Sequence, residues 1–187
     1  MGLFDALLGK SKQVKANLDG LFAVPTAAIT LAVAANLDAT NRAAVVFMPA
    51  SGAAFANTEK EFQEVIAEFQ NTSVELKTDS FGYRWVIITA DGIESLVTAV
   101  HSVNRSLEDH GFSPQLLCSV FGFTGRTTGS RAYWVYLYKR GTFYPFVPAG
   151  HERRDNEQEL SLKATVGNDL PLEEDVSRWF ALWDIPF

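Results

Sequence analysis

Two long stretches of the chain space their apolar residues as one face of a helix does. The first begins near Thr58 and Glu61, which have capping-box spacing, and its apolar positions recur at i, i+3, i+4 and i+7. The second runs from Asp91, an N-cap residue type, to Gly111, which suits a left-handed C-cap. We predict a helix over each stretch. The apolar stripes are Phe62, Val65, Ile66 and Phe69 in the first and Ile93, Leu96, Val97, Val100 and Leu107 in the second.

Strand patterns and turn residues surround these two helices. A short helix is predicted over 18–24, capped by Asn17 and ended by Pro25. Residues 27–34 and 42–48 have strand composition and are joined by the turn-like NLDATN. Residues 74–78 and 83–89 are likewise joined by a turn over 79–82. Each pair is therefore predicted to form a hairpin.

The second half of the chain is predicted to be mostly strand. Residues 115–123 and 132–139 flank the loop TGRTTGSR, and 142–147 pairs back. Residues 159–166 alternate apolar and polar like a half-buried strand, and Pro171 opens a last helix. Hairpin connections imply antiparallel pairing. The predicted fold is therefore α+β, with a mostly antiparallel sheet built from hairpins, packed by two longer helices plus a C-terminal helix.

Composition and charge narrow the class of protein. The 187 residues carry a formal net charge of -6, and the pI is near 5.1. Broad nucleic-acid binding needs a basic face, so we expect no nucleic-acid partner. The single cysteine excludes an intramolecular disulfide. No apolar run approaches the roughly 20 residues that span a bilayer. We expect a cytoplasmic protein with a single α+β domain over 17–187.

The first residues, MGLFDALLGKSKQVKA, form an amphipathic segment and a basic linker over 1–16. Their apolar side chains would lie on one side of a helix, and lysines follow at once. This order fits reversible contact with an anionic membrane, which would place the protein at the inner face of the membrane. A partner, a second subunit or the chain's own domain are alternative surfaces, and the sequence leaves all of them open. The predicted contact residues are Leu3, Phe4, Leu7, Leu8, Lys10, Lys12 and Lys15.

The loop over 124–131 is rich in glycine and arginine. Backbone N–H groups and guanidinium groups together can hold a phosphate, so this loop is a candidate anion site. It lacks the P-loop spacing and lysine, and no helix is predicted after it. The pattern keeps an alternative function open, namely a small-ligand or anion-binding protein, enzymes included. The candidate residues are Gly125, Arg126, Gly129 and Arg131.

Other reactive residue types form no catalytic or metal-binding pattern. Cys118 has apolar sequence neighbours, which indicates a buried thiol and not an activated nucleophile. The three histidines lack the spacing of a zinc site. We therefore assign no catalytic residue, no metal ligand and no cofactor.

Aromatic residues concentrate late in the chain. Trp134, Tyr136 and Tyr138 share one face of the predicted strand 132–139, and an exposed aromatic face of this size is costly. We predict that a helix or loop covers it, with a partner, homodimer or ligand surface as the alternative. Trp179 and Trp183 lie on the stripe of the predicted last helix, which either docks on the core or forms a partner surface.

Segments at both ends of the chain resemble one known family. They are MGLFDALLGKSK, NLDGLFAVPTAAITL and HERRDNEQELSLKATVGNDLPLEEDVSRWFALWDIPF. In these segments the chain is similar to the PspA-associated AB proteins (PspAB) of the phage-shock envelope-stress system, and GLFDALLG and W-x-x-x-W-x-I-P are the most specific parts. The resemblance implies a PspA-type stress protein as partner and supplies no catalytic residue. We therefore expect a non-enzymatic adaptor or regulator of envelope stress.

Overall fold

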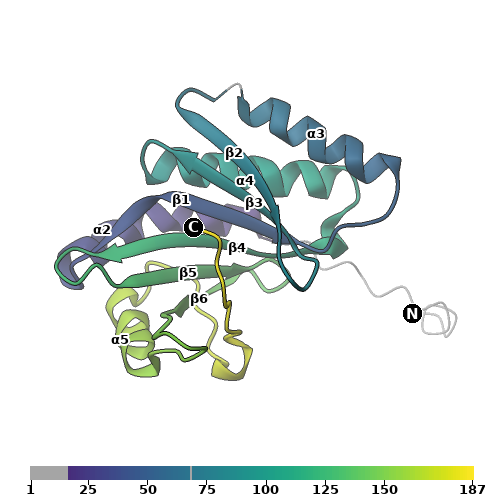
Figure 1. Cartoon of the computed structure of the whole chain (residues 1–187). Coiled ribbons are helices and arrows are strands. Elements are labelled where there is room, and N and C mark those ends of the chain that lie inside the picture. Colours follow the sequence, from purple (N-terminus) through teal and green to yellow (C-terminus); the bar gives the residue numbers. More distant parts are fainter. Residues whose placement is uncertain (1–16, 68) are drawn as a thin grey trace, which may run out of the picture.

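The structure, a computed structural model, describes residues 17–67 and 69–187 and has one six-stranded antiparallel sheet (Figure 1). Its helices are α2 (Val24–Ala34), α3 (Ala53–Ala67), α4 (Ile93–Asp109) and α5 (Asn156–Val166), with 3-10 turns η1 (Leu18–Ala23), η2 (Ser113–Gln115) and η3 (Val176–Arg178). Its strands are β1 (Leu37–Phe47), β2 (Thr72–Thr78), β3 (Arg84–Ala90), β4 (Leu116–Gly125), β5 (Arg131–Leu137) and β6 (Thr142–Phe146). The strand order is β2-β3-β1-β4-β5-β6, which confirms the α+β class and the antiparallel sheet.

Three of the predicted hairpin connections are confirmed. β2 pairs with β3, β4 with β5, and β5 with β6, each antiparallel and adjacent in sequence. β1 lies between β3 and β4 and pairs with both. The centre of the sheet is therefore made by pairings between segments far apart in the chain.

The predicted hairpin of 27–34 with 42–48 is wrong, because residues 24–34 form helix α2. Pro25 lies in the first turn of that helix, where its fixed φ and missing N–H cost nothing. It therefore begins a helix and does not end one. The strand at 42–48 is real and is the second half of β1.

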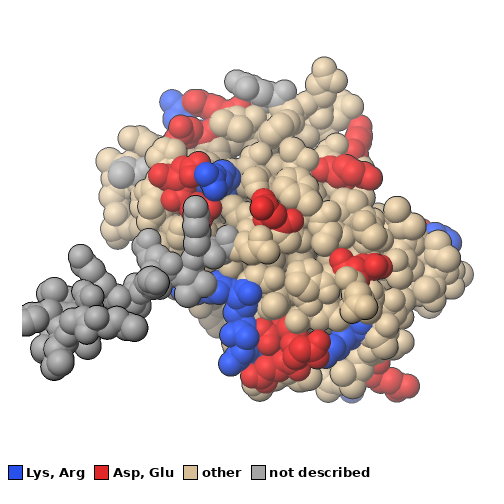
Figure 2. Space-filling model, turned by 180° about the vertical axis from the view of Figure 1, so that it is seen from behind, with Lys and Arg blue, Asp and Glu red and all other residues tan. Residues whose placement is uncertain are grey.

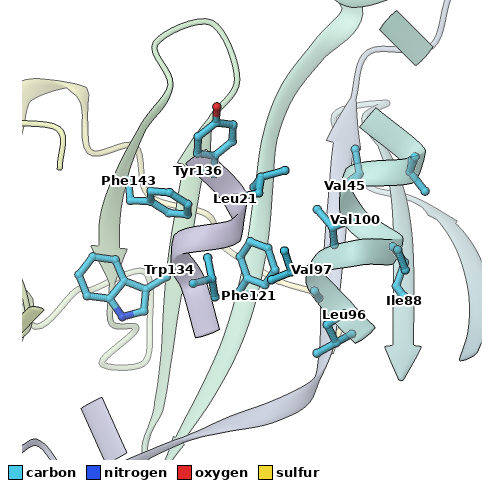
Figure 3. Packing of buried hydrophobic residues seen from close by; sticks show 14 of the residues in the cluster. Leu21, Val45, Ile88, Leu96, Val97, Val100, Phe121, Trp134, Tyr136 and Phe143 are labelled. Atoms are coloured by element: carbon cyan, nitrogen blue, oxygen red, sulfur yellow. The ribbon is translucent and has the colours of Figure 1, made fainter. Parts of the chain in front are cut away.

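The helices cover one face of the sheet and bury the larger core. α2 and α4 pack on β1, and α3 packs on α4 and β2. Figure 3 shows side chains from α4 meeting those of β1, β3 and β4, while Leu21 lies near Tyr136 and Phe143. Trp134, Tyr136 and Tyr138 belong to this core, which confirms that the aromatic face of β5 is covered.

The predicted strand at 159–166 is wrong, because these residues form helix α5. Asp155 caps the helix, with its Oδ1 accepting a hydrogen bond from the Gln158 N–H at 2.9 Å. Leu162 and Val166, four residues apart, are the buried apolar positions, whereas Leu160 is exposed. The burial therefore follows a helical period, and the alternation of apolar and polar residues over eight positions was coincidental.

The prediction of a last helix is also wrong, because only a single 3-10 turn, η3, forms in that segment. Residues 170–187 instead form what we call the C-terminal strap, which runs across the second face of the sheet (Figure 1). Its partly buried residues Leu182, Trp183, Ile185 and Phe187 pack against the smaller core of that face. Helices therefore cover one face, and an irregular segment covers much of the other.

Candidate functional site

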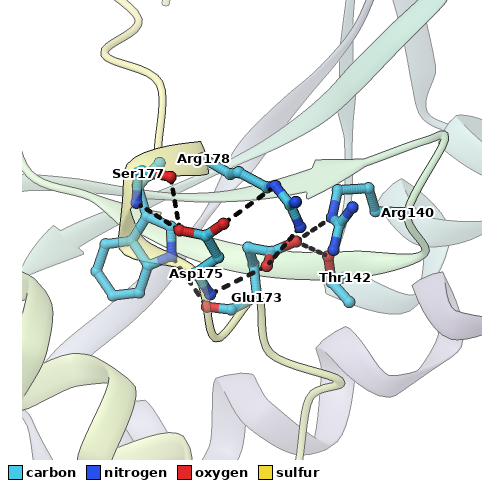
Figure 4. A network of polar contacts seen from close by, with 7 residues as sticks. Arg140, Thr142, Glu173, Asp175, Ser177 and Arg178 are labelled. Carbon is cyan, nitrogen blue, oxygen red and sulfur yellow. Dashed lines mark hydrogen bonds and ion pairs between the residues drawn. The ribbon is translucent and has the colours of Figure 1, made fainter.

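A buried carboxylate fastens the start of the strap to the sheet. Glu173 Oε2 accepts hydrogen bonds from Arg140 Nε and from Thr142 Oγ1, the latter at 3.1 Å (Figure 4). Its Oε1 accepts from the Asp175 N–H at 3.1 Å, and its carbonyl oxygen accepts from Trp179 Nε1 at 3.0 Å. Burial by itself would raise the pKa of Glu173, but the hydrogen bonds from Arg140, Asp175 and Thr142 hold that pKa below its usual value.

A second ion pair fastens the middle of the strap to α5. Arg154 Nε lies 3.0 and 2.9 Å from the two carboxylate oxygens of Glu159, and Oε1 also accepts from the Val147 N–H at 2.9 Å. Arg154 Nη1 donates to the carbonyl oxygen of Trp179 at 2.5 Å. The indole of Trp179 stacks on Tyr144, with ring centroids 6.2 Å apart. The path of the strap is thus set by charged groups on both sides of Trp179.

An apolar cleft of about 740 Å³ opens between the strap, the β2–β3 turn and the adjoining ends of β4 and β5. Its wall is apolar, and cations and exposed aromatic rings surround it. The wall includes Val46, Trp85, Leu116, Leu117, Cys118, Leu137, Tyr144, Leu182 and Trp183, and the exposed or charged residues are Asp79, Phe81, Lys139, Arg140, Arg178, Phe180 and Ala181. A cleft of this volume is in the range of ligand and peptide sites.

Cys118 lies in the wall of this cleft but is itself buried. Burial raises the pKa of its thiol to about 12. The thiol is therefore protonated near neutral pH and does not supply a thiolate nucleophile. This confirms the buried thiol expected from its apolar neighbours.

A second apolar surface lies on the outer side of η1 and α2. The inner side of α2 packs on the core through Val24, Ala27, Ala28 and Leu31. On the outer side Phe22, Ile29 and Val33 are 50%, 67% and 79% exposed. We call these three residues the outer stripe. A helix that is apolar all round is normally buried on every side.

The loop at 124–131 uses its polar groups within the protein. Arg126 makes a two-point contact with Asp38, Nε to Oδ2 at 3.0 Å and Nη2 to Oδ1 at 2.5 Å, and this hydrogen bonding lowers the pKa of Asp38. The N–H groups of Gly125 and Gly129 donate to Ser130 and Gly125 carbonyl oxygens, both at 2.8 Å. Within 17–67 and 69–187, Arg131 is exposed and has no ion pair. Anion binding here stays a prediction.

The other sequence-predicted residues fall in three places. Trp179 is buried in the smaller core, whereas Trp183 is partly exposed in the cleft wall, so the strap places the two tryptophans in different environments. The seven contact residues predicted at 3–15 lie outside the described residues. Neither the cleft nor the outer stripe was predicted from the sequence. The signal for the stripe was present, because VPTAAITLAVA has no charged residue on any side.

Metal and membrane-spanning features are absent from the part of the chain that the structure describes. No three or more His, Cys, Asp or Glu side chains gather there in a way that could hold a metal ion. None of the helices described in this range is both long enough and apolar enough to cross a bilayer.

Comparison with known proteins gives one match. The model of the family described as PspA associated protein B matches residues 1–187, the whole chain. The chain belongs to the PspA associated protein B family. No curated protein and no solved structure matched.

Membership of this family confirms the resemblance seen in the terminal segments and implies association with a PspA system. It assigns no role to any residue. The surfaces that carry such an association therefore have to be argued from the geometry of the fold.

Proposed function

We propose that this PspA associated protein B is a non-enzymatic adaptor or regulator of an envelope-stress system, and that it contacts a PspA-type protein through the outer stripe. The observation that carries this proposal is the exposure of Ile29 and Val33 on the uncharged helix α2, together with that of Phe22 on the preceding turn η1. Broad uncharged surface lies between scattered acidic and basic groups on the helical side of the molecule (Figure 2). The proposed protein acts in the cytoplasm, and contact of residues 1–16 with the inner face of the membrane is an alternative that sedimentation with anionic vesicles tests.

Three arguments favour the outer stripe as the partner surface. Exposed apolar residues clustered on one helix mark interaction sites more often than scattered ones do. Ile29 and Val33, four residues apart, present anchors on successive turns of α2, as helix-in-groove recognition requires, and Phe22 lies seven residues before Ile29 on η1. The opposite side of α2 is fixed on the sheet, so the anchors are held in place before binding and lose little conformational freedom.

Binding of the purified full-length protein to the PspA-type protein of the same genome tests the proposal. We expect Ile29→Glu and Val33→Glu to weaken binding at least tenfold, because a carboxylate buried in an apolar interface has no partner. Val176→Glu is the matched control, since Val176 is also exposed and apolar but lies on the strap. It should bind as the wild type does.

Two results would overturn the proposal. Absence of any binding to the PspA-type protein rejects the adaptor role. Equal binding by all three variants rejects the outer stripe as the site. Light scattering of the protein alone adds a check, because a wild-type homodimer that Ile29→Glu dissociates would assign the outer stripe to a second copy of this chain.

A further inference from the structure

The first described residue of the chain, Asn17, lies at the turn between β5 and β6, which includes residues of the cleft wall. Tyr136 Oη donates a hydrogen bond to the carbonyl oxygen of Asn17. A Cβ placed on Gly141 would lie 3.5 Å from the Cβ of Asn17. Gly141 directly follows Arg140, one of the cations at the cleft. Residues 1–16 therefore join the fold at the β5–β6 turn, on the helix-covered face of the sheet, and would reach the cleft by passing round this turn to the second face.

We propose that residues 1–16 of the same chain bind in this cleft, with Leu3, Phe4, Leu7 and Leu8 against its apolar wall. The inference goes beyond association with a PspA system and does not depend on it. The cleft would then bind a segment of its own chain, and the amphipathic segment would pack on its own domain.

The length of the linker permits this binding. Residues 9–16 can span roughly 26 Å when extended, at about 3.3 Å per residue. The cleft crosses from β3 to β5, which are three strand positions apart and thus about 14 Å from each other at roughly 4.8 Å per position. The reach of the linker exceeds this span, which leaves length for the chain to pass round the β5–β6 turn to the second face and enter the cleft.

The chemistry of the two surfaces is complementary. The cleft offers partly exposed Leu117, Leu182 and Trp183, and the segment carries four large apolar residues that a helix would present on one side. The complementarity is apolar and not electrostatic, because residues 1–16 carry three lysines and one acid, Asp5, and the cations at the cleft are Lys139, Arg140 and Arg178.

Tethering favours the same occupant. A segment this short does not form a helix alone in water, so it needs an apolar surface to fold against. A short tether raises the effective concentration of the segment at the cleft to the millimolar range. A contact that would be weak between separate molecules is therefore populated within one chain.

Cross-linking of the full-length protein tests the inference. Cysteines replace Ala6 in the segment and Ala181, which is exposed in the cleft wall, and a short bis-maleimide joins them. Cys118 stays in place because its buried thiol is slow to react. The matched pair is Ala6→Cys with Val33→Cys, since Val33 is exposed outside the cleft. We expect the cleft pair to cross-link within one chain at least tenfold faster than the matched pair.

A further variant separates specific binding from chance collision of the tether. Phe4→Ser leaves both cysteines unchanged and removes one apolar contact, so it should slow the cleft cross-link at least fivefold. Equal rates for the two cysteine pairs, or a rate that Phe4→Ser leaves unchanged, overturn the inference. Products that join two chains overturn it in favour of a second copy. The absence of a cleft cross-link in a protein that sediments with anionic vesicles overturns it in favour of lipid.

Discussion

The buried ion pair between Arg154 and Glu159 makes a prediction about stability. The Glu159 side chain is 1% exposed and that of Arg154 is 20% exposed, so neither charge is well solvated. Glu159→Gln removes the negative charge but keeps an oxygen that can accept the hydrogen bond from the Val147 N–H. The substitution therefore isolates the effect of leaving Arg154 without its counter-charge.

The expected loss of stability is large for a change of a single charge. Removing one partner of a buried ion pair costs about 3–5 kcal/mol, and the partial exposure of Arg154 favours the lower end of about 3 kcal/mol. Small domains lose about 2 kcal/mol of stability per molar urea, so the urea midpoint should fall by about 1.5 M.

Equilibrium urea unfolding followed by tryptophan fluorescence measures this change. Glu174→Gln is the control, because Glu174 pairs with Lys163 but is 78% exposed, and such pairs contribute at most about 1 kcal/mol. The reasoning is refuted if Glu159→Gln loses less than about 1 kcal/mol and so matches the control.

Three other substitutions or treatments have definite expected outcomes. The folded-state pKa of Glu173 lies below its unfolded value of about 4.3, so its stabilisation is complete above that pH and is lost as the pH falls through the folded-state pKa. The difference in melting temperature between wild type and Glu173→Gln should therefore shrink in acid, and a constant difference would contradict this. Cys118 should react with iodoacetamide at pH 8 far more slowly in the native protein than in urea, as mass spectrometry can measure. Gly122→Ala should lower stability by about 1–3 kcal/mol in thermal unfolding. A Cβ there would lie 2.7 Å from Thr40 Oγ1 and 3.2 Å from the Phe187 ring, and an unchanged melting temperature would show that both give way.

Local signals predicted the elements that depend on local interactions. Helix α4 has a clear apolar stripe and ends before Gly111, whose φ of 81° is the left-handed conformation that its sequence position indicated. The β2–β3 hairpin followed from its turn residues, because Asp79 Oδ1 accepts from the N–H groups of Phe81 and Tyr83, both at 2.9 Å.

The wrong secondary-structure predictions arose where the spacing of apolar residues fits more than one kind of element. Over a segment as short as 159–166, alternation and helical spacing share Leu162 and Val166, and the deciding feature was the cap at Asp155. In the strap, the apolar residues have the spacing of a helical stripe, but the segment is irregular. Its backbone does not form a helix because Glu173 and Arg154 hold it on the sheet. These partners are distant in sequence, so local pattern could not reveal them.

The cleft could not be predicted from the sequence for the same reason. The cleft is built from five separate parts of the chain, which are the end of β1, the β2–β3 turn with the start of β3, the start of β4, the end of β5 with β6, and the strap. Its existence depends on the position of β1 between β3 and β4, which no hairpin signal indicates.

The strap also protects an edge of the sheet. β6 is an edge strand, and such strands can pair with other chains and start aggregation. The Phe143 N–H donates to the Pro171 carbonyl oxygen at 2.7 Å, and the Phe143 carbonyl oxygen accepts from the Glu173 N–H at 2.8 Å. Pro145, further along β6, has no N–H to offer. The start of the strap thus keeps β6 from recruiting a strand of another molecule, so variants that loosen the strap should promote self-association as well as lower stability.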